Sequence, residues 1–118
     1  MEQLTPIEEK TMQAVWQTGE GNIKAFLENM EEQIAYTTIA SVMKNLEKKN
    51  FVSSHLTGNV YIYKPKVSEA YYKRKFMGSV VENYFSNSYK ELVNFFVEQN
   101  KLSAIELKEI ISLIEKGK

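Results

Sequence analysis

The stretch AYTTIASVMKNLEKKNFV, residues 35–52, decides the fold of this chain. Its apolar side chains recur with the i, i+3, i+4, i+7 spacing of one buried face of a helix, at Ile39, Val42, Met43 and Leu46. The opposite face carries side chains that are small or basic and no carboxylate: Thr37, Ala40, Ser41, Lys44 and Lys48. We therefore predict a helix whose outer face approaches a partner closely.

The chain is neutral overall, but its charges are unevenly distributed. Residues 1–32 contain two Lys and seven Glu, whereas residues 33–78 contain eight Lys or Arg and two Glu. A basic middle segment between acidic ends can form a local positive surface on a neutral protein. Uneven sampling in a short chain is the alternative explanation.

Several residue types that catalysis and metal binding need are missing from the 118 residues. The chain has no Cys, no Asp and only one His, His55. A cysteine nucleophile, a Ser-His-Asp triad and a multi-histidine metal site are therefore excluded within one chain. We predict that the protein is not an enzyme and has no cofactor and no metal site.

No apolar run approaches the roughly 20 residues that a membrane-spanning helix needs. The N-terminus also lacks the basic and then apolar pattern of a secretory signal. We therefore expect a cytoplasmic protein without membrane insertion.

The first half of the chain has the element order of a winged helix-turn-helix. Thr5, Pro6 and Glu8 predict a capped first helix that ends near Gly19, and Asn22 caps a short second helix. The third helix should stop near Asn50, after which residues 52–57 and 60–63 alternate around the turn signal Gly58-Asn59. Three helices and a hairpin place the third helix in the major groove of DNA, with the hairpin beside it. We assign residues 1–67 to a DNA-binding domain.

Three more helices are expected at about 68–87, 88–100 and 103–116, with Ser68 as an N-cap residue and capping boxes at Ser88 and Ser103. Some fifty residues are too few to bury so much apolar surface alone, so we predict that residues 68–118 form a helical homodimerisation segment. Packing against the N-terminal half of the same chain is the alternative. The predicted dimerisation residues are Phe76, Val80, Tyr84, Phe85, Phe95, Phe96, Leu107, Ile110, Ile111 and Ile114.

With these elements placed, the chain resembles the penicillinase repressor family (BlaI/MecI/CopY type). The resemblance lies in LTPIEEKTMQAVWQ, in AYTTIASVMKNLEKKNFV, in the wing that ends YIYKPKV, and in a tail with ELVNFFVEQNKLS and IELKEI. It implies a mainly α fold with a small β-hairpin wing, and a homodimeric transcriptional repressor that binds a double-stranded, pseudo-palindromic operator.

The resemblance further implies control by a membrane-bound sensor metalloprotease that cleaves the repressor. The matching region contains Asn94, Phe95 and Phe96, and the alignment leaves open which pair is cut. Copper-responsive members carry cysteines near the C-terminus, and these are absent here. The family also offers more arginine near the groove, whereas Arg74 is the only arginine of this chain.

The helix around residues 36–49 is predicted to supply most of the contacts to DNA. Short polar side chains can hydrogen-bond to base edges, Lys44 can reach guanine or a phosphate, and Tyr36 suits a phosphate at the helix N-terminus. The predicted DNA-binding residues are Tyr36, Thr37, Thr38, Ser41, Lys44, Asn45, Lys48, His55 and Lys64.

Two other functions remain open from the sequence. A winged-helix module that binds a protein and no DNA would need the acidic first helix to interrupt the basic surface. A small hydrolase or transferase is disfavoured by the missing Asp, Cys and His. For individual positions the alternative is plain solvation, most of all for His55 on the hairpin surface. For Lys48 and Lys49 the alternative to reading bases is a general positive patch on the surface.

Overall fold

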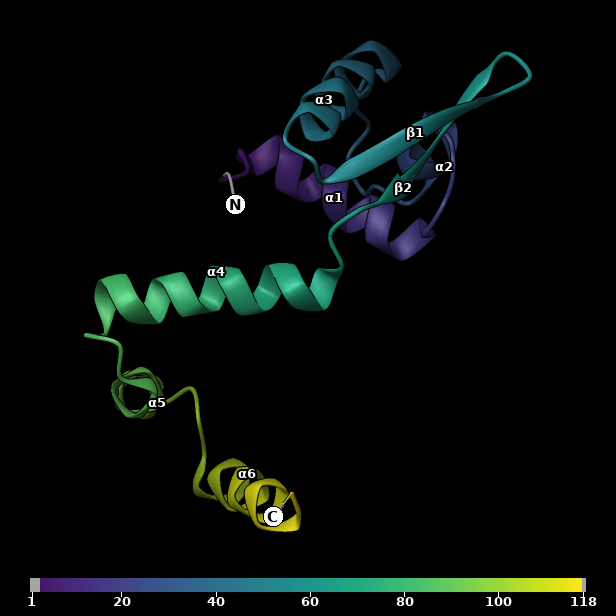
Figure 1. Ribbon diagram of the computed structural model, residues 1–118. Helices are drawn as coiled ribbons and strands as arrows, with labels where there is room; N and C mark the ends of the chain where they lie inside the picture. Colours follow the sequence, from purple (N-terminus) through teal and green to yellow (C-terminus); the bar gives the residue numbers. More distant parts are fainter. Residues whose placement is uncertain (1–2, 118) are drawn as a thin grey trace. The chain divides into compact units, whose positions relative to one another are not determined.

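The computed structural model describes residues 3–117, and within them the chain forms six helices and one antiparallel hairpin (Figure 1). The elements are α1 (Pro6–Thr18), α2 (Ile23–Glu28), α3 (Tyr36–Lys48), β1 (Val52–Thr57), β2 (Val60–Pro65), α4 (Glu69–Tyr84), α5 (Tyr89–Glu98) and α6 (Ala104–Lys116). The predicted element order is confirmed. The predicted fold class, mainly α with a small β-hairpin, is confirmed as well.

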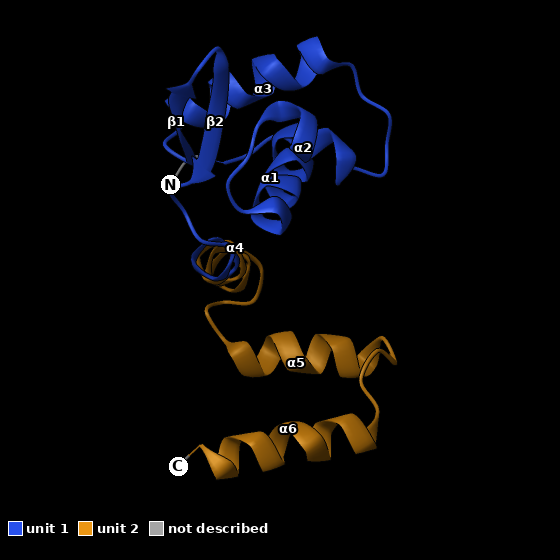
Figure 2. Cartoon of the chain, turned by 90° about the vertical axis from the view of Figure 1, so that its right-hand side faces the viewer, with its two compact units in different colours: residues 1–73 blue, residues 74–118 orange. Residues whose placement is uncertain are grey.

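The chain divides into two compact units, residues 1–73 and residues 74–118 (Figure 2). The first turn of α4 is part of the first unit because the Tyr72 ring lies 5.5 Å from that of Trp16 and 5.9 Å from that of Phe51. Trp16 also donates its indole N–H to the carbonyl oxygen of Val67 at 2.9 Å. The compact part thus extends beyond residue 67, where we placed the end of the DNA-binding domain.

Side-chain caps fix the starts of α1, α2, α5 and α6. Thr5 and Glu8 exchange hydrogen bonds at the start of α1, and Ser103 and Glu106 do so at α6. Asn22 caps α2 through the Ala25 amide. At α5 the Ser88 hydroxyl accepts the Glu91 amide, but the reciprocal bond of a complete capping box is not among the contacts described there.

One core holds the first unit together. The four apolar side chains of α3 are buried as predicted, and they pack with residues of α1, α2 and the hairpin. The buried core comprises Leu4, Met12, Ala14, Val15, Ile23, Phe26, Ile39, Val42, Met43, Leu46, Phe51, Val52 and Tyr63. Burial of this apolar surface is the main force that holds α3 in place.

A tight turn carries the chain from α3 into the hairpin. Asn50 adopts a φ of 65°, as predicted for the residue that ends the helix, and the Phe51 amide donates to the Leu46 carbonyl at 2.9 Å. The hairpin then closes over Gly58, whose φ is 63°, with Thr57 opposite Val60. Tyr63 exchanges two backbone hydrogen bonds with Gly21, which ties β2 to the turn after α1.

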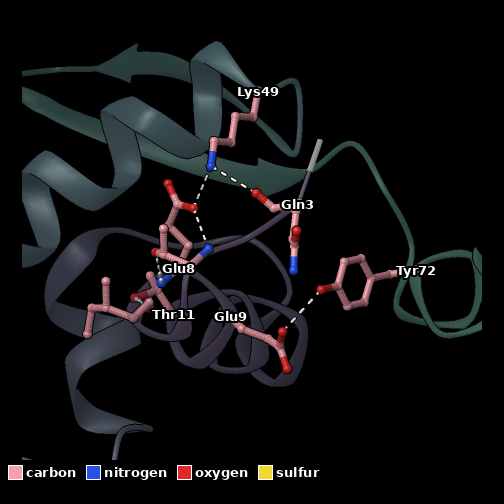
Figure 3. Close-up of polar contacts among 8 residues, drawn as sticks. Gln3, Glu8, Glu9, Thr11, Lys49 and Tyr72 are labelled. Carbon is pink, nitrogen blue, oxygen red and sulfur yellow. Dashed lines mark hydrogen bonds and ion pairs between the residues drawn. The ribbon is translucent and has the colours of Figure 1, made fainter. Parts of the chain in front are cut away.

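A partly buried ion pair joins the start of α1 to the end of α3 (Figure 3). The Lys49 ammonium lies 2.6 Å from a Glu8 carboxylate oxygen and 3.1 Å from the carbonyl oxygen of Gln3. Burial alone would raise the pKa of the Glu8 carboxyl, but the hydrogen bonds from Lys49 and from the Thr5 amide outweigh it. The pKa of Glu8 is therefore lowered below its usual value of 4.5.

The second unit is built differently from the first. Val81 is the one buried residue among residues 74–117, although α5 and α6 each carry an apolar stripe. Within it the Phe95 ring packs against two others, at 5.6 Å from Phe85 and 5.4 Å from Phe96, measured between ring centroids. Most of the apolar surface of this unit is exposed.

The Glu8–Lys49 pair should make the first unit sensitive to acid. Because the pKa of Glu8 is lower in the folded state, its stabilising contribution is complete above about pH 4.5 and is lost as the pH falls through the folded pKa. Urea unfolding can be followed by the fluorescence of Trp16, the only tryptophan. We expect the unfolding free energy of the wild type to fall more steeply with acid than that of Lys49→Met.

At pH 7 the Lys49→Met variant should be less stable than the wild type by about 1–3 kcal/mol, because Glu8 stays buried without its cation. Lys48→Met is the matched control, since Lys48 is exposed and should change stability by less than about 0.5 kcal/mol. Equal stability and equal acid dependence of the wild type and Lys49→Met would show that the pair contributes nothing.

Candidate nucleic-acid interface

Helix α3 has one sealed face and one open face. Ile39, Met43 and Leu46 are fully buried, whereas Thr37, Ser41 and Asn45 are exposed on successive turns of the other side. The nine residues predicted to contact DNA are all exposed: Tyr36, Thr37, Thr38, Ser41, Lys44, Asn45, Lys48, His55 and Lys64. Ala40, which the sequence placed on the outer face, is instead half-buried and packs against the core.

The N-terminus of α3 is left without a side-chain cap. Ala35 has extended backbone angles and supplies no side-chain acceptor. Its carbonyl oxygen accepts the amides of Thr38 and Ile39, so the first helical amides have no acceptor from a capping side chain. Amides in this position, at the positive end of the helix dipole, can bind an anion such as a phosphate.

The cations of this region are not equivalent. Lys44, Lys48 and Lys64 are exposed and take part in no salt bridge found within residues 3–117. Lys49 differs because Glu8 neutralises it. The sequence interpretation that placed Lys49 with Lys48 in a positive patch is therefore wrong, because Lys49 points back into the body of the unit (Figure 3).

The carboxylate of α3, on Glu47, is hydrogen-bonded to the hairpin. Glu47 accepts a hydrogen bond from the Ser54 hydroxyl at 2.6 Å. Burial raises the pKa of the Tyr63 phenol, and the nearby Glu47 carboxylate and the Tyr36 and Tyr61 phenols raise it further. The Ser54–Glu47 bond ties β1 to the C-terminal end of α3. Sequence periodicity gave no signal for the Ser54–Glu47 bond.

His55 lies on the other side of the hairpin from Ser54. Its ring nitrogen Nε2 is 3.7 Å from a carboxylate oxygen of Glu20, and both side chains are about half exposed. This position next to a carboxylate is less suited to a phosphate contact than those of Lys44 and Lys64. Its contact to DNA remains a prediction.

The predicted dimerisation residues share one property: none of them is buried within its own chain. Val80, Phe85 and Leu107 are half-buried, and the other seven are exposed, namely Phe76, Tyr84, Phe95, Phe96, Ile110, Ile111 and Ile114. The residues of the predicted cleavage region, Asn94, Phe95 and Phe96, lie exposed on α5.

Neither a metal site nor a membrane span appears in the described part of the chain. Residues 3–117 contain no group of three His, Cys, Asp or Glu side chains that could hold a metal ion. None of the helices described is long and apolar enough to cross a membrane.

Comparison with known proteins gives one consistent result. The family model described as penicillinase repressor matches residues 4–116. The penicillinase repressor of Bacillus licheniformis is 23% identical over 118 residues, which cover 98% of this chain and 92% of that protein. The methicillin resistance regulatory protein MecI of Mammaliicoccus sciuri and that of Staphylococcus aureus (strain N315) are each 22% identical over 116 residues, 97% of this chain and 94% of theirs.

The open face of α3 should tolerate substitution without loss of stability. We expect the free energy of unfolding of the double variant Ser41→Ala, Lys44→Ala to lie within about 0.5 kcal/mol of the wild-type value, because both side chains are exposed. Met43→Ala, on the sealed face, should cost about 2–5 kcal/mol. Urea unfolding followed by Trp16 fluorescence measures both. A double variant as unstable as Met43→Ala would mean that the open face has a structural role.

Proposed function

Because this chain belongs to the penicillinase repressor family, a family of DNA-binding transcriptional regulators and not of enzymes, we propose that it is a homodimeric repressor that reads a pseudo-palindromic operator through α3. The observation that carries the proposal is the two-sided α3. Its sealed face fixes the helix on the core, and its open face offers short polar groups and the cations Lys44 and Lys48.

The small side chains of the open face support a close approach to base edges. Thr37, Ser41 and Asn45 are about one turn apart, so the helix backbone can lie deep in the major groove while each reaches a different base pair. Tyr36 and the uncapped amides of the first turn would contact a phosphate at the groove edge. Lys44, Lys48 and Lys64 would supply the phosphate contacts that give affinity.

A salt series tests this proposal. Fluorescence anisotropy is measured on a duplex from the upstream region of the protein's own gene and on a shuffled duplex of the same composition. We expect much tighter binding to the first duplex, and a log affinity that falls linearly with log salt. Lys44→Ala should reduce that slope by about 0.9 for each phosphate contact that is lost.

The matched control is Lys108→Ala, which removes an exposed lysine of α6 and should leave the slope unchanged. Equal, salt-sensitive binding to both duplexes would point to an operator elsewhere. Absence of binding at low salt would favour the alternative, a winged-helix module that binds a protein and no DNA.

The exposed apolar face of the second unit supports dimerisation. Ile110, Ile111 and Ile114 lie on neighbouring positions of α6 and are exposed, although isoleucine is among the residues most often buried. An apolar patch of this kind marks a contact surface with another protein chain. A second copy of the chain would cover it and would also bring two α3 helices to two half-sites.

Charge placed on this face should separate the copies. We expect the double variant Ile110→Glu, Ile114→Glu to sediment as a monomer, and its operator affinity to fall by about 100-fold or more because two linked half-site contacts are lost. Ser112→Glu is the matched control, an exposed polar position of the same helix. A double variant that stays dimeric would place the dimer contact elsewhere.

We also propose that cleavage in α5 ends repression. Asn94, Phe95 and Phe96 lie in the middle of α5 and are exposed. A cut at either bond, Asn94–Phe95 or Phe95–Phe96, would divide α5 and separate α6 from the DNA-binding unit, so it would disrupt both apolar stripes available for dimerisation. The membrane-bound sensor metalloprotease implied by the family would be the partner in this step.

A further inference from the structure

The outer half of the hairpin carries an exposed apolar surface that the proposed contacts of α3 do not use. Leu56 is 58% exposed, Tyr61 56% and Val60 46%, and they lie next to the Gly58-Asn59 turn. The tip of the hairpin projects beyond the three helices of the first unit (Figure 1). A strand end that is free of packing and still apolar is a surface for a partner.

The register divides this surface into two faces. Leu56 lies directly opposite Tyr61, so both side chains point to the same side of the hairpin. That side is shared by Ser54, which bonds Glu47 of α3, and by the buried Tyr63. Leu56 and Tyr61 therefore extend the surface that begins at the C-terminal half of α3. Val60, opposite Thr57, belongs to the other side.

The outer part of the hairpin, beyond Lys64, carries no charged side chain. Residues 50–63 contain no Lys, Arg, Asp or Glu. The flanking Lys49 is held by Glu8, and His55 lies beside Glu20 on the side away from Leu56. The tip therefore has no positively charged side chain that could attract a DNA phosphate. The deoxyribose walls of a minor groove, by contrast, are surfaces that an apolar side chain can contact.

We propose that Leu56 and Tyr61 enter the minor groove beside the site read by α3, and that Leu56 selects A·T pairs there by apolar contact. A G·C pair presents the guanine 2-amino group in the minor groove, and an apolar side chain would leave that donor without an acceptor. A·T pairs have no such group, and TA steps open easily for an inserted side chain. This inference rests on the proposed function of α3.

Selection from a random duplex pool tests the inference without knowledge of the operator. The full-length wild type should select a core sequence with A·T pairs at fixed flanking positions. Leu56→Asn, which keeps the size of the side chain and makes it polar, should select the same core with the flanking preference lost. Val60→Asn is the matched control on the opposite face and should select as the wild type does.

Fluorescence anisotropy on the selected duplex then measures how much each substitution changes the affinity for DNA. Leu56→Asn should weaken binding by about 10-fold, as expected for the loss of one buried leucine contact, and Tyr61→Ala by at least as much. The salt slope should not change, since no phosphate contact is lost. In the wild type, replacing the flanking A·T pairs by G·C should weaken binding similarly, and inosine·C pairs, which lack the 2-amino group, should restore it.

The outcomes separate this inference from the proposed function. A wild type that selects no sequence would overturn both. A wild type that selects a core, with Leu56→Asn and Val60→Asn indistinguishable from it, would overturn only the role of the wing and leave its tip as a surface for a protein partner. A reduced salt slope in Leu56→Asn would also overturn the inference, because the tip would then act through phosphates.

Discussion

The inner face of α3 is the constraint on which the rest of the first unit depends. Ile39, Met43 and Leu46 are sealed between α1, α2 and the start of the hairpin, so the helix can neither rotate nor slide without exposing them. The orientation of the opposite face follows from that burial and not from any contact of its own. A DNA-binding helix benefits from this arrangement, since its polar side chains stay free of structural duties and are held ready at the surface.

The two units meet the need for burial in opposite ways. The first closes a core within one chain, and even its buried carboxylate, Glu8, has a cation and a backbone donor. The second arranges equally apolar helices and buries only Val81 within residues 74–117. An apolar stripe without a partner raises the free energy of the isolated unit in water, so association is the natural completion of its fold. The dimerisation proposed for this chain would in this sense follow from the short helices of the tail.

Local rules made much of this structure predictable from the sequence. Caps at Thr5, Asn22 and Ser103, the end of α3 at Asn50 and the turn at Gly58 depend on neighbouring residues, and each is found as expected. The errors concern contacts between distant segments. Lys49 was assigned to the surface because periodicity does not reveal that Glu8, 41 positions earlier, lies beneath it. The exposure of Leu56 was not predicted for the same reason. Alternating polar and apolar residues predict a strand, but they do not show which part of the strand packs against the rest of the unit.

The charges left over on the first unit suggest how affinity and selectivity are divided. Lys49 is neutralised by Glu8 and Glu47 is tied to Ser54. The exposed cations near α3 include Lys44, Lys48 and, at the base of the wing, Lys64, whereas the outer part of the wing, residues 50–63, contributes none. Few phosphate contacts mean few released counterions, and therefore a salt dependence weaker than that of a strongly basic repressor. If the protein binds DNA as proposed, more of its binding free energy would come from base edges and apolar groove contacts, which depend on sequence. A neutral protein can in this way bind DNA selectively. Its charge attracts DNA of any sequence only weakly, so the sequence-specific contacts decide where it binds.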